Sequence, residues 1–276
     1  MTSETKRVFL LGRGIENSLS PRIQNAAFRT LKINTKYELK ELGRVKLTKF
    51  VSDIPNDILG FNVTAPFKEE IMQFLDSVDS LSKSVGAVNT VKIDTAGKMH
   101  GFNTDYDGVI ASLQELTGLN RKKPMENVVL LGSGGAARAC VFALLKSGFR
   151  QIKILNRTLE KAQNLSKQFV VSFSDAEIEA LKLTRNELTR SFQNCSLLIN
   201  ASSDTSLDID FRGKSLKFFD LHYMKENHLI KQAEKNGIPC IDGLFMLVIQ
   251  AAKSFEIWTG KKAPVQVMMH AAKQSR

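Results

Sequence analysis

The sequence predicts a two-domain α/β protein whose second domain is Rossmann-like, with a doubly wound parallel sheet. Three observations predict this fold. The 276 residues suffice for one to two domains at about 150 residues per domain. Short strands and helices alternate along the chain. A wholly apolar strand also runs into a glycine-rich turn that is followed by a helix. The 43% hydrophobic and 24% charged residues exclude a largely disordered chain.

The apolar runs are too short for a membrane protein. The run 244–249 has six residues and the run 8–11 has four, whereas a membrane-spanning helix needs about 20. We therefore expect a cytoplasmic protein with no membrane partner. Three cysteines lie far apart without a Cys-x-x-Cys pair, and four histidines lack metal-ligand spacing, so neither a disulfide framework nor a metal site is expected.

The net charge of +11 (39 − 28) invites a nucleic-acid interpretation. However, the basic residues are spread along the chain, and pairs such as Lys122-Lys123 are typical of solvated faces. A basic surface also suits a protein that handles anions, such as a dinucleotide phosphate and a carboxylate substrate. We therefore expect small-molecule partners and no nucleic acid. A dinucleotide-sensing or nucleic-acid-binding protein stays as the non-enzyme alternative.

The first domain begins with a strand at 7–11 and a helix with Ser20 at the N-cap and Pro21 at its first position. Strands are predicted at 37–42, 58–63 and 87–93. Between the last two, Ile71, Phe74, Leu75 and Val78 follow helical spacing and predict an amphipathic helix.

The second domain follows a helix at 105–116 that Gly118 closes, and a polar stretch at 120–124 interpreted as a loop or linker. Strand 128–131 is apolar throughout, as expected for a strand buried on both faces. The alternation then continues to a helix that ends at Gly237, and a last helix begins near Leu244. Its predicted elements are strand 152–155, a helix from Leu159, and strands 170–173, 197–199 and 218–221.

The glycine-rich turn matches G-x-G-x-x-A. Gly132 permits the tight turn, Gly134 lets the backbone approach a pyrophosphate, and Ala137 allows close packing of helix on strand. The following helix offers free N–H groups to the anion. We predict that cofactor contacts come from Gly132, Ser133, Gly134, Gly135 and Ala136.

The end of the next strand predicts which cofactor binds. NAD-binding forms carry a carboxylate about 20 residues after the turn, where it accepts from the ribose 2′-hydroxyl. Here the strand ends in Leu155-Asn156-Arg157-Thr158, with Asn156 24 positions after Gly132 and no carboxylate. Arg157 offers a planar fork of donors suited to a 2′-phosphate, which favours NADP.

Several polar segments of the chain could each be an ordinary helix cap, turn or edge strand. Taken together, they match the signature segments of one protein family. Gly60-Phe61-Asn62-Val63-Thr64-Ala65-Pro66-Phe67-Lys68, Gly86-Ala87-Val88-Asn89-Thr90 and Asn103-Thr104-Asp105-x-x-Gly108 resemble, in order, three signature segments of the shikimate dehydrogenase family. Ser18-Leu19-Ser20-Pro21, Asn156-Arg157-Thr158 with Lys161, Asp220-Leu221-His222-Tyr223 and residues 243–251 resemble further segments. The family commonly has His where Gln24 stands and Pro after Tyr223, where Met224 stands.

The resemblance implies NADP-dependent reduction of 3-dehydroshikimate to shikimate, on the way to chorismate and aromatic amino acids. It implies a substrate domain of residues 1–104 completed by 244–276, and an NADP domain of residues 105–243. A quinate/shikimate dehydrogenase or another polyol-acid dehydrogenase remains the alternative enzyme. The oligomeric state stays open, with a homodimer as one option.

The resemblance also implies the site residues. Lys68 and Asp105 form the catalytic pair, and a lysine withdrawn from water can exchange a proton or polarise the carbonyl oxygen. Whether Lys68 carries the proton or chiefly binds stays open. Gln250 lies off the apolar stripe of its helix, which independently marks it. The implied substrate contacts are Ser18, Ser20 and Tyr223 for the carboxylate and Thr64, Asn89 and Gln250 for the hydroxyls. The further cofactor contacts are Asn156, Arg157, Thr158, Lys161, Leu221 and Gly243.

Overall fold

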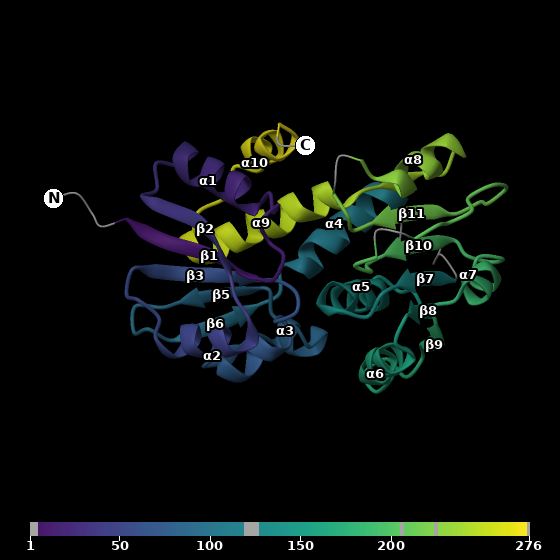
Figure 1. Ribbon diagram of the computed structural model, residues 1–276, viewed down its shortest axis with the longest axis horizontal. Coiled ribbons are helices and arrows are strands. Elements are labelled where there is room, and N and C mark those ends of the chain that lie inside the picture. The colour runs from purple at the N-terminus through teal and green to yellow at the C-terminus, as the bar shows by residue number, and fades with distance from the viewer. Residues whose placement is uncertain (1–4, 119–126, 205–206, 224–225, 275–276) are drawn as a thin grey trace. The chain divides into compact units, whose positions relative to one another are not determined.

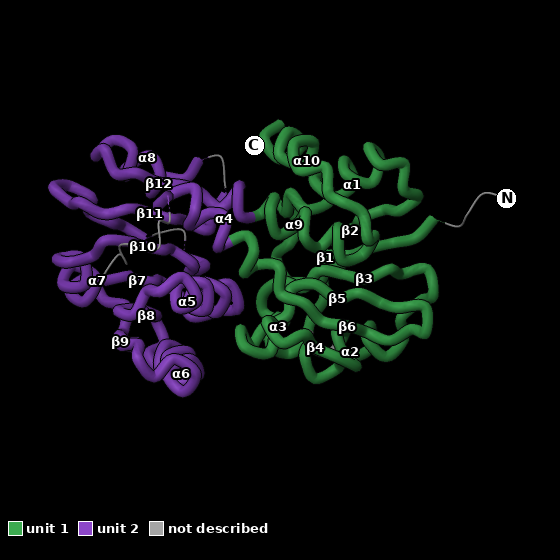
Figure 2. The backbone as a smooth tube through the Cα atoms, turned by 180° about the vertical axis from the view of Figure 1, so that it is seen from behind, with its two compact units in different colours: residues 1–108, 247–276 green, residues 109–246 purple. Residues whose placement is uncertain are grey.

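The computed structural model describes residues 5–118, 127–204, 207–223 and 226–274, and the predicted linker 120–124 lies outside them. The chain forms two compact units (Figure 2): unit 1 comprises residues 1–108 and 247–276, and unit 2 comprises residues 109–246. The divisions fall inside two helices, α4 (Asp105–Thr117) and α9 (Gly243–Thr259). Unit 1 is therefore built from two segments that are distant in the sequence.

Unit 1 contains a mixed six-stranded sheet. The strand β1 pairs in parallel with β2 and β3, whereas β5 runs antiparallel to both β3 and β6. The short β4 pairs in parallel with β6 at the edge. The order is β2 (Thr35–Glu41), β1 (Lys6–Gly12), β3 (Ile58–Val63), β5 (Thr90–Ile93), β6 (Met99–Phe102), β4 (Ser77–Val78).

Helices cover both faces of this sheet (Figure 1). On one face lie α1 (Ser20–Thr30), α9 and α10 (Val265–Lys273), where the Phe28 and Phe255 rings are 5.1 Å apart. On the other lie α2 (Arg44–Ser52), the 3-10 helix η1 (Glu70–Phe74) and α3 (Ser80–Val85). There Phe50 packs edge-on against Phe61. The second face also holds an apolar cluster that includes Ile71.

Two local predictions in unit 1 are wrong. The expected helix at 71–78 is η1 followed by β4, because Asp76 exchanges hydrogen bonds with the backbone of Met99 and draws the chain into the sheet. The apolar spacing still marks side chains that face one core. Ser20 is not the N-cap of α1. The N-cap is Leu19, whose side chain has no polar atom for a cap bond, and the Ser20 hydroxyl pairs with Ser18 Oγ at 3.2 Å.

Unit 2 contains a six-stranded sheet that is parallel throughout. The chain goes from β7 outward through β8 to β9, then returns to β10 beside β7 and goes outward the other way. The strand order thus reverses between β7 and β10, where doubly wound sheets bind ligands at the carboxyl ends of their strands. The order is β12 (Cys240–Ile241), β11 (Lys217–Asp220), β10 (Leu197–Asn200), β7 (Val128–Leu131), β8 (Gln151–Asn156), β9 (Glu177–Lys182).

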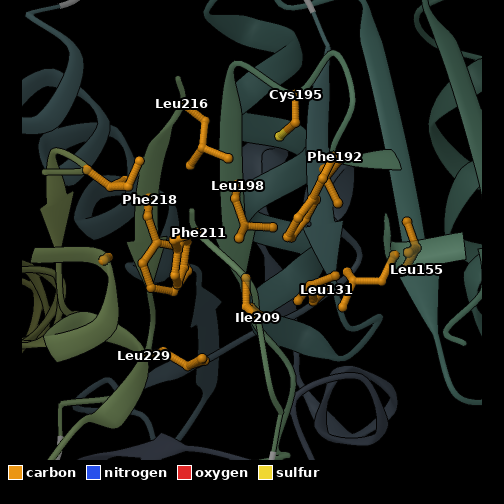
Figure 3. Close-up of a cluster of buried hydrophobic side chains, with 14 residues drawn as sticks. Leu131, Leu155, Phe192, Cys195, Leu198, Ile209, Phe211, Leu216, Phe218 and Leu229 are labelled. Atoms are coloured by element: carbon orange, nitrogen blue, oxygen red, sulfur yellow. The ribbon is translucent and has the colours of Figure 1, made fainter. Parts of the chain in front are cut away.

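Apolar side chains cover both faces of the central strands of unit 2, which confirms the doubly wound fold. On one face, α7 (Arg185–Ser191) and α8 (His228–Lys235) pack over a cluster that contains Leu131, Leu198 and Phe218 (Figure 3). The helices α5 (Gly135–Lys146) and α6 (Leu159–Val170) follow β7 and β8 and contact each other. In the described part of the chain, no helix is long and apolar enough to cross a membrane.

The predicted strand at 170–173 is wrong. The helix α6 continues to Val170, and the strand that pairs with β8 is β9, at Glu177–Lys182. Its sequence Glu-Ile-Glu-Ala-Leu-Lys is half charged because β9 is an edge strand with exposed side chains. The apolar run at 170–173 therefore does not mark a strand, whereas the alternating sequence of residues 177–182 does.

Candidate active site

Unit 1 brings the two predicted catalytic residues into contact. Lys68 follows β3, and Asp105 is the first residue of α4. The Lys68 Nζ lies 2.5 Å from Asp105 Oδ2, and the two side chains are only 13% and 6% exposed. The Lys68 backbone is held as well, since its carbonyl accepts from the Val88 N–H at 2.8 Å. The pair is thus an ordered ion pair largely withdrawn from water.

Asn89 holds the carboxylate of this pair. Its Oδ1 accepts from the Thr104 backbone N–H at 2.8 Å, and its Nδ2 donates to Asp105 Oδ1 at 2.9 Å. A backbone N–H can only donate and a carboxylate accepts, so these two bonds fix the orientation of the amide. Asn89 is 2% exposed. The second N–H of this amide is directed at Thr104 Oγ1, 2.9 Å from Nδ2, with Gln250 Oε1 at 3.3 Å.

Gln250 joins the same cluster from α9. Its Oε1 lies 3.3 Å from both Asn89 Nδ2 and Thr104 Oγ1, while its Nε2 donates to the Leu247 carbonyl at 2.9 Å. Although Gln250 lies off the apolar stripe of its helix, it is only 9% exposed. The segments around residues 68, 89, 105 and 250 thus meet at one place within unit 1.

A layer of buried hydroxyls supports this cluster and was not among the predicted site residues. Ser254, one helical turn after Gln250, is fully buried, and its Oγ lies 2.8 Å from Thr90 Oγ1 and 3.1 Å from Thr104 Oγ1. Asn62 donates to it at 3.1 Å and accepts from Tyr37 Oη at 2.8 Å. The i, i+4 spacing places Ser254 and Gln250 on one side of α9, but it does not show that the Ser254 hydroxyl reaches Thr90 and Thr104.

The predicted carboxylate segment also belongs to unit 1. Ser18 Oγ lies 3.2 Å from Ser20 Oγ and accepts from the Ser20 backbone N–H at 3.2 Å. One turn later in α1, Gln24 donates to the carbonyl of Ala251 at 2.8 Å, next to Gln250. Thr64 directly follows β3 and is partly buried, and its backbone N–H donates to the Leu11 carbonyl at 2.8 Å. The serine loop is therefore tied to the helix that carries Gln250.

The glycine-rich turn in unit 2 has the shape of a phosphate cradle. Gly132 has a φ of +103°, and a Cβ there would lie 2.6 Å from the Ala201 carbonyl oxygen, so a side chain does not fit. Gly134 is the N-cap of α5 with no side-chain cap, and a Cβ there would meet nothing within 4 Å. Its outer face is therefore open to a ligand, as are the first N–H groups of α5. Ser133, Gly135 and Ala136 complete the turn, and all three are partly buried.

The start of α6 offers a second place for an anion. Thr158 is its N-cap without a side-chain cap bond, while Asn156 donates to the Thr158 carbonyl at 2.9 Å. Arg157 and Lys161 are exposed beside this helix end. Arg157 is 69% exposed on its side chain, and Asp204 lies 4.0 Å away. Two cations and a free helix N-terminus at the end of β8 suit a phosphomonoester.

The segment after β11 packs tightly against the start of α9. A Cβ on Gly243 would lie 1.9 Å from the Leu221 carbonyl oxygen, and the Gly243 N–H donates to the His222 carbonyl at 3.0 Å. Tyr223 follows in unit 2, partly buried. Its predicted place beside Ser18 and Ser20 stays a prediction.

The cysteines have the character of core residues. Cys140, Cys195 and Cys240 are free thiols, and burial raises the pKa of Cys195 to about 12 and that of Cys240 to about 11. Neither of these two thiols is a nucleophile at neutral pH. The part of the chain that the structure describes holds no group of three His, Cys, Asp or Glu residues placed to bind a metal.

Known proteins share both the sequence and the fold. Family profiles match at residues 10–91 (shikimate dehydrogenase substrate binding domain), 115–210 (shikimate / quinate 5-dehydrogenase) and 243–273 (shikimate 5′-dehydrogenase C-terminal domain). The shikimate dehydrogenase (NADP(+)) of Methanococcus maripaludis is 39% identical over 98% of this chain and 97% of its own.

Solved structures agree with this match. A shikimate dehydrogenase in complex with NADP+ is 34% identical, with a TM-score of 0.85 over 98% of this chain and 95% of its own. The enzyme from Thermus thermophilus, in complex with NADP(H) and shikimate, is 29% identical, with a TM-score of 0.81 over 98% of this chain and 100% of its own. Because family profiles match most of the chain and a relative is 39% identical over nearly its whole length, the chain belongs to the shikimate dehydrogenase family.

Proposed function

We propose that this chain catalyses the reversible reduction of 3-dehydroshikimate to shikimate by NADPH, with unit 1 binding the substrate and unit 2 the cofactor. The contact between Lys68 and Asp105, held by Asn89 and adjoined by Gln250, carries the proposal. A merely dinucleotide-binding protein has no need of a buried ion pair with ordered amides in its other unit. The alternative of a nucleic-acid-binding protein gains no support from this cluster.

Lys68 acts on the carbonyl oxygen. Bound NADPH supplies the hydride, and the oxygen of the reduced carbonyl then needs a proton. The Lys68 ammonium, 2.5 Å from Asp105, can polarise this oxygen and donate the proton to it. Asp105 keeps the ammonium directed, and its second oxygen is held by Asn89. In the oxidation of shikimate the same lysine receives the hydroxyl proton.

The remaining polar residues of unit 1 bind the substrate. Ser18 and Ser20 offer adjacent hydroxyls for the carboxylate, and we propose that Tyr223 adds a third. Thr64 and Gln250 bind ring hydroxyls. Asn89 can reach a ring hydroxyl only with the N–H that otherwise donates to Thr104 Oγ1 at 2.9 Å, because its Oδ1 accepts from the Thr104 backbone N–H and its other N–H donates to Asp105. Its principal role is therefore to position Asp105.

The residues of unit 2 fit NADP. The turn from Gly132 to Ala136 binds the pyrophosphate by backbone N–H groups, and Gly134 leaves the space for its approach. Arg157, Lys161 and the start of α6 bind the 2′-phosphate, with Asn156 and Thr158 shaping that turn. Leu221 follows β11, and Gly243 begins α9 shortly after β12. Both lie on the other side of the point where the strand order reverses, and we propose that the nicotinamide half binds there.

The direct test is consumption of NADPH on addition of 3-dehydroshikimate, followed by nicotinamide absorbance. Oxidation of shikimate and of quinate is assayed in parallel, each with NADP+ and with NAD+. We expect the highest kcat/KM for shikimate with NADP+. A higher kcat/KM for quinate would favour the quinate enzyme on the same scaffold, and no turnover of either acid would contradict the proposal. Homodimerisation and a cytoplasmic location stay predictions from the sequence.

A further inference from the structure

A buried carboxylate and a histidine form a pair at the carboxyl end of β11. Asp220 is 1% exposed, and its Oδ1 lies 2.8 Å from His222 Nδ1. The same oxygen accepts from the His222 backbone N–H and from Asn200 Nδ2, both at 3.1 Å. The other oxygen accepts from Asn227 Nδ2 at 3.1 Å. The carboxylate is thus fixed by four bonds, and it fixes the imidazole.

This geometry assigns the ring nitrogens of His222 different roles. Because Asp220 accepts, the hydrogen-bond network places the proton of the neutral ring on Nδ1. Nε2 is then the nitrogen that gains or loses a proton. The side chain is 24% exposed, so this titration is open to solvent and to a ligand. His222 can therefore gain or lose its charge at Nε2 while Nδ1 keeps its hydrogen bond to Asp220.

The charges around His222 favour its protonated form. The hydrogen bond to Asp220 raises the pKa of His222, and the negative charges of Asp220 and Asp204 add to this, while burial opposes it. Arg157 lies 4.0 Å from Asp204. A histidine whose pKa is raised keeps its imidazolium form to a higher pH than a free histidine does, and it becomes neutral as the pH rises further.

His222 lies at the end of the sheet where the nicotinamide half of a dinucleotide is expected. The strands β11, β10 and β7 are adjacent and parallel, so the end of β11 is about 10 Å from the end of β7 across the sheet. Arg157 follows β8, on the other side of the point where the strand order reverses. A dinucleotide bound across that point has its 2′-phosphate half toward β8 and its nicotinamide half toward β10 and β11.

We propose that His222 contacts the nicotinamide half of the cofactor, and that its imidazolium weakens binding of NADP+ relative to NADPH. This inference rests on the NADP site proposed above. The oxidised nicotinamide ring carries a positive charge that the reduced ring lacks, so the imidazolium repels only the oxidised form. NADP+ should accordingly bind more tightly once His222 is neutral, whereas NADPH should be nearly indifferent.

The test compares the dissociation constants of the two cofactors across the pH range of histidine. NADPH binding is followed by its fluorescence and NADP+ binding by displacement, from about pH 5.5 to about pH 8.5. The 2′-phosphate also titrates near pH 6, but it does so in both cofactors and largely cancels from the ratio of their Kd values. We expect the ratio Kd(NADP+)/Kd(NADPH) to fall about three- to tenfold as pH rises, equivalent to a coupling of about half to one pKa unit.

Two variants separate His222 from other titrating groups. His222→Asn keeps an amide donor near the position of Nδ1 and cannot titrate, so its ratio should be independent of pH. His228→Gln is the matched control, because His228 begins α8 in the same unit, with its Nε2 2.8 Å from the Leu207 carbonyl, which a glutamine can also reach. Its ratio should retain the wild-type pH dependence. A flat ratio in the wild type, or an unchanged slope in His222→Asn, would overturn the proposal.

A measurement on the wild-type protein keeps the proposal testable if His222→Asn does not fold. The His222 ring is titrated by NMR in the NADP+ and NADPH complexes, and its pKa should be lower with NADP+. Equal pKa values in both complexes would overturn the proposal even with normal cofactor affinity. Failure of the wild type to bind either cofactor would instead contradict the NADP site itself.

Discussion

The two units build their sites in different ways. Unit 1 relies on buried side chains: Asn89, Thr104, Asp105 and Ser254 are 2%, 1%, 4% and 0% exposed and hold one another. Unit 2 relies on backbone shape, glycines and helix ends, with Arg157 69% exposed on its side chain. In unit 1 a lost side-chain atom leaves a buried partner unsatisfied. In unit 2, by contrast, an added side-chain atom clashes with the backbone or fills the space left for a ligand.

This difference predicts which substitutions affect catalysis and which affect affinity. A change in the buried network of unit 1 should alter kcat while cofactor binding persists. A change in the turn or at α6 should alter cofactor affinity while the Lys68–Asp105 pair persists. Five predictions test this separation, in order of decreasing effect.

Lys68→Ala should have the largest effect. Loss of a positioned proton donor typically lowers kcat by about 10²–10⁴-fold. NADPH affinity should be unchanged, because the glycine turn and Arg157 belong to unit 2. The measurement is steady-state kinetics with NADPH binding by fluorescence, and Lys83→Ala, an exposed lysine of α3, is the control. An intact kcat with only a raised KM would show that Lys68 is a binding group.

Asp105→Asn extends this test to the pair. It keeps the shape but removes the charge that directs the ammonium, so it should also lower kcat. The double variant with Lys68→Ala should lose less than the product of the two single losses, since both residues serve one step. Fully multiplicative losses would mean that Lys68 and Asp105 act independently.

A pair of alanine substitutions in the glycine turn tests the backbone site. Gly132→Ala should lower the free energy of unfolding by roughly 1–3 kcal/mol, because its φ is +103° and its Cβ would strike Ala201. Gly134→Ala should leave stability nearly unchanged, since a Cβ there meets no protein atom, yet weaken NADPH binding by filling the open face. Denaturant unfolding and fluorescence binding measure the two effects. Equal destabilisation by both changes would refute this picture of the turn.

Arg157→Ala should weaken NADPH binding about ten- to a hundredfold through loss of a charge-assisted hydrogen bond. NADH, which lacks the 2′-phosphate, should bind the variant and the wild type alike. Binding titrations with both cofactors provide the comparison. Equal losses for NADPH and NADH would assign Arg157 to the fold or to the pyrophosphate.

Ser254→Ala should have the smallest effect, a decrease in kcat of about two- to tenfold, corresponding to one net hydrogen bond. Its hydroxyl supports Thr104, which in turn holds Asn89 and Gln250. Ser52→Ala is a matched control, since Ser52 Oγ also bonds to the carbonyl four residues earlier, at 2.9 Å, but on the exposed end of α2. A decrease in stability with unchanged kcat would give Ser254 a purely structural role.

Much of unit 2 could be predicted from the sequence because its physical constraints are local. A strand buried on both faces must be apolar throughout, and Val128–Leu131 is the element that the structure shows. The edge strand β9 and the short β4 were missed because their pairing depends on distant partners rather than on hydrophobicity. The apolar spacing at Ile71 marked a buried face correctly but could not distinguish a helix from a turn that leads into an edge strand.

Some site residues could likewise be identified from local sequence, whereas others depend on contacts that only the fold creates. Lys68, Asn89, Asp105 and Gln250 were found through motifs, and the structure brings them together. Ser254 was missed because a serine in an apolar helix is indistinguishable by sequence from one that bonds its own backbone. Its Oγ does bond to the Gln250 carbonyl at 3.0 Å, and only the fold shows that it also reaches Thr90 and Thr104. The Asp220–His222 contact likewise depends on the turn after β11.

The discontinuity of unit 1 has a consequence for the order of synthesis. Residues 109–246 form a continuous unit that can fold once they have emerged, as domains generally do during translation. Unit 1 must wait, because its α9 packs Trp258 against Tyr37 of β2 and Phe255 against Phe28 of α1, and α10 packs against α1. The same late segment brings Gln250 and Ser254 to the Lys68–Asp105 pair. A nascent chain can therefore assemble its nucleotide cradle early, while its proton-transfer centre is completed only after α9 has packed onto the sheet of unit 1.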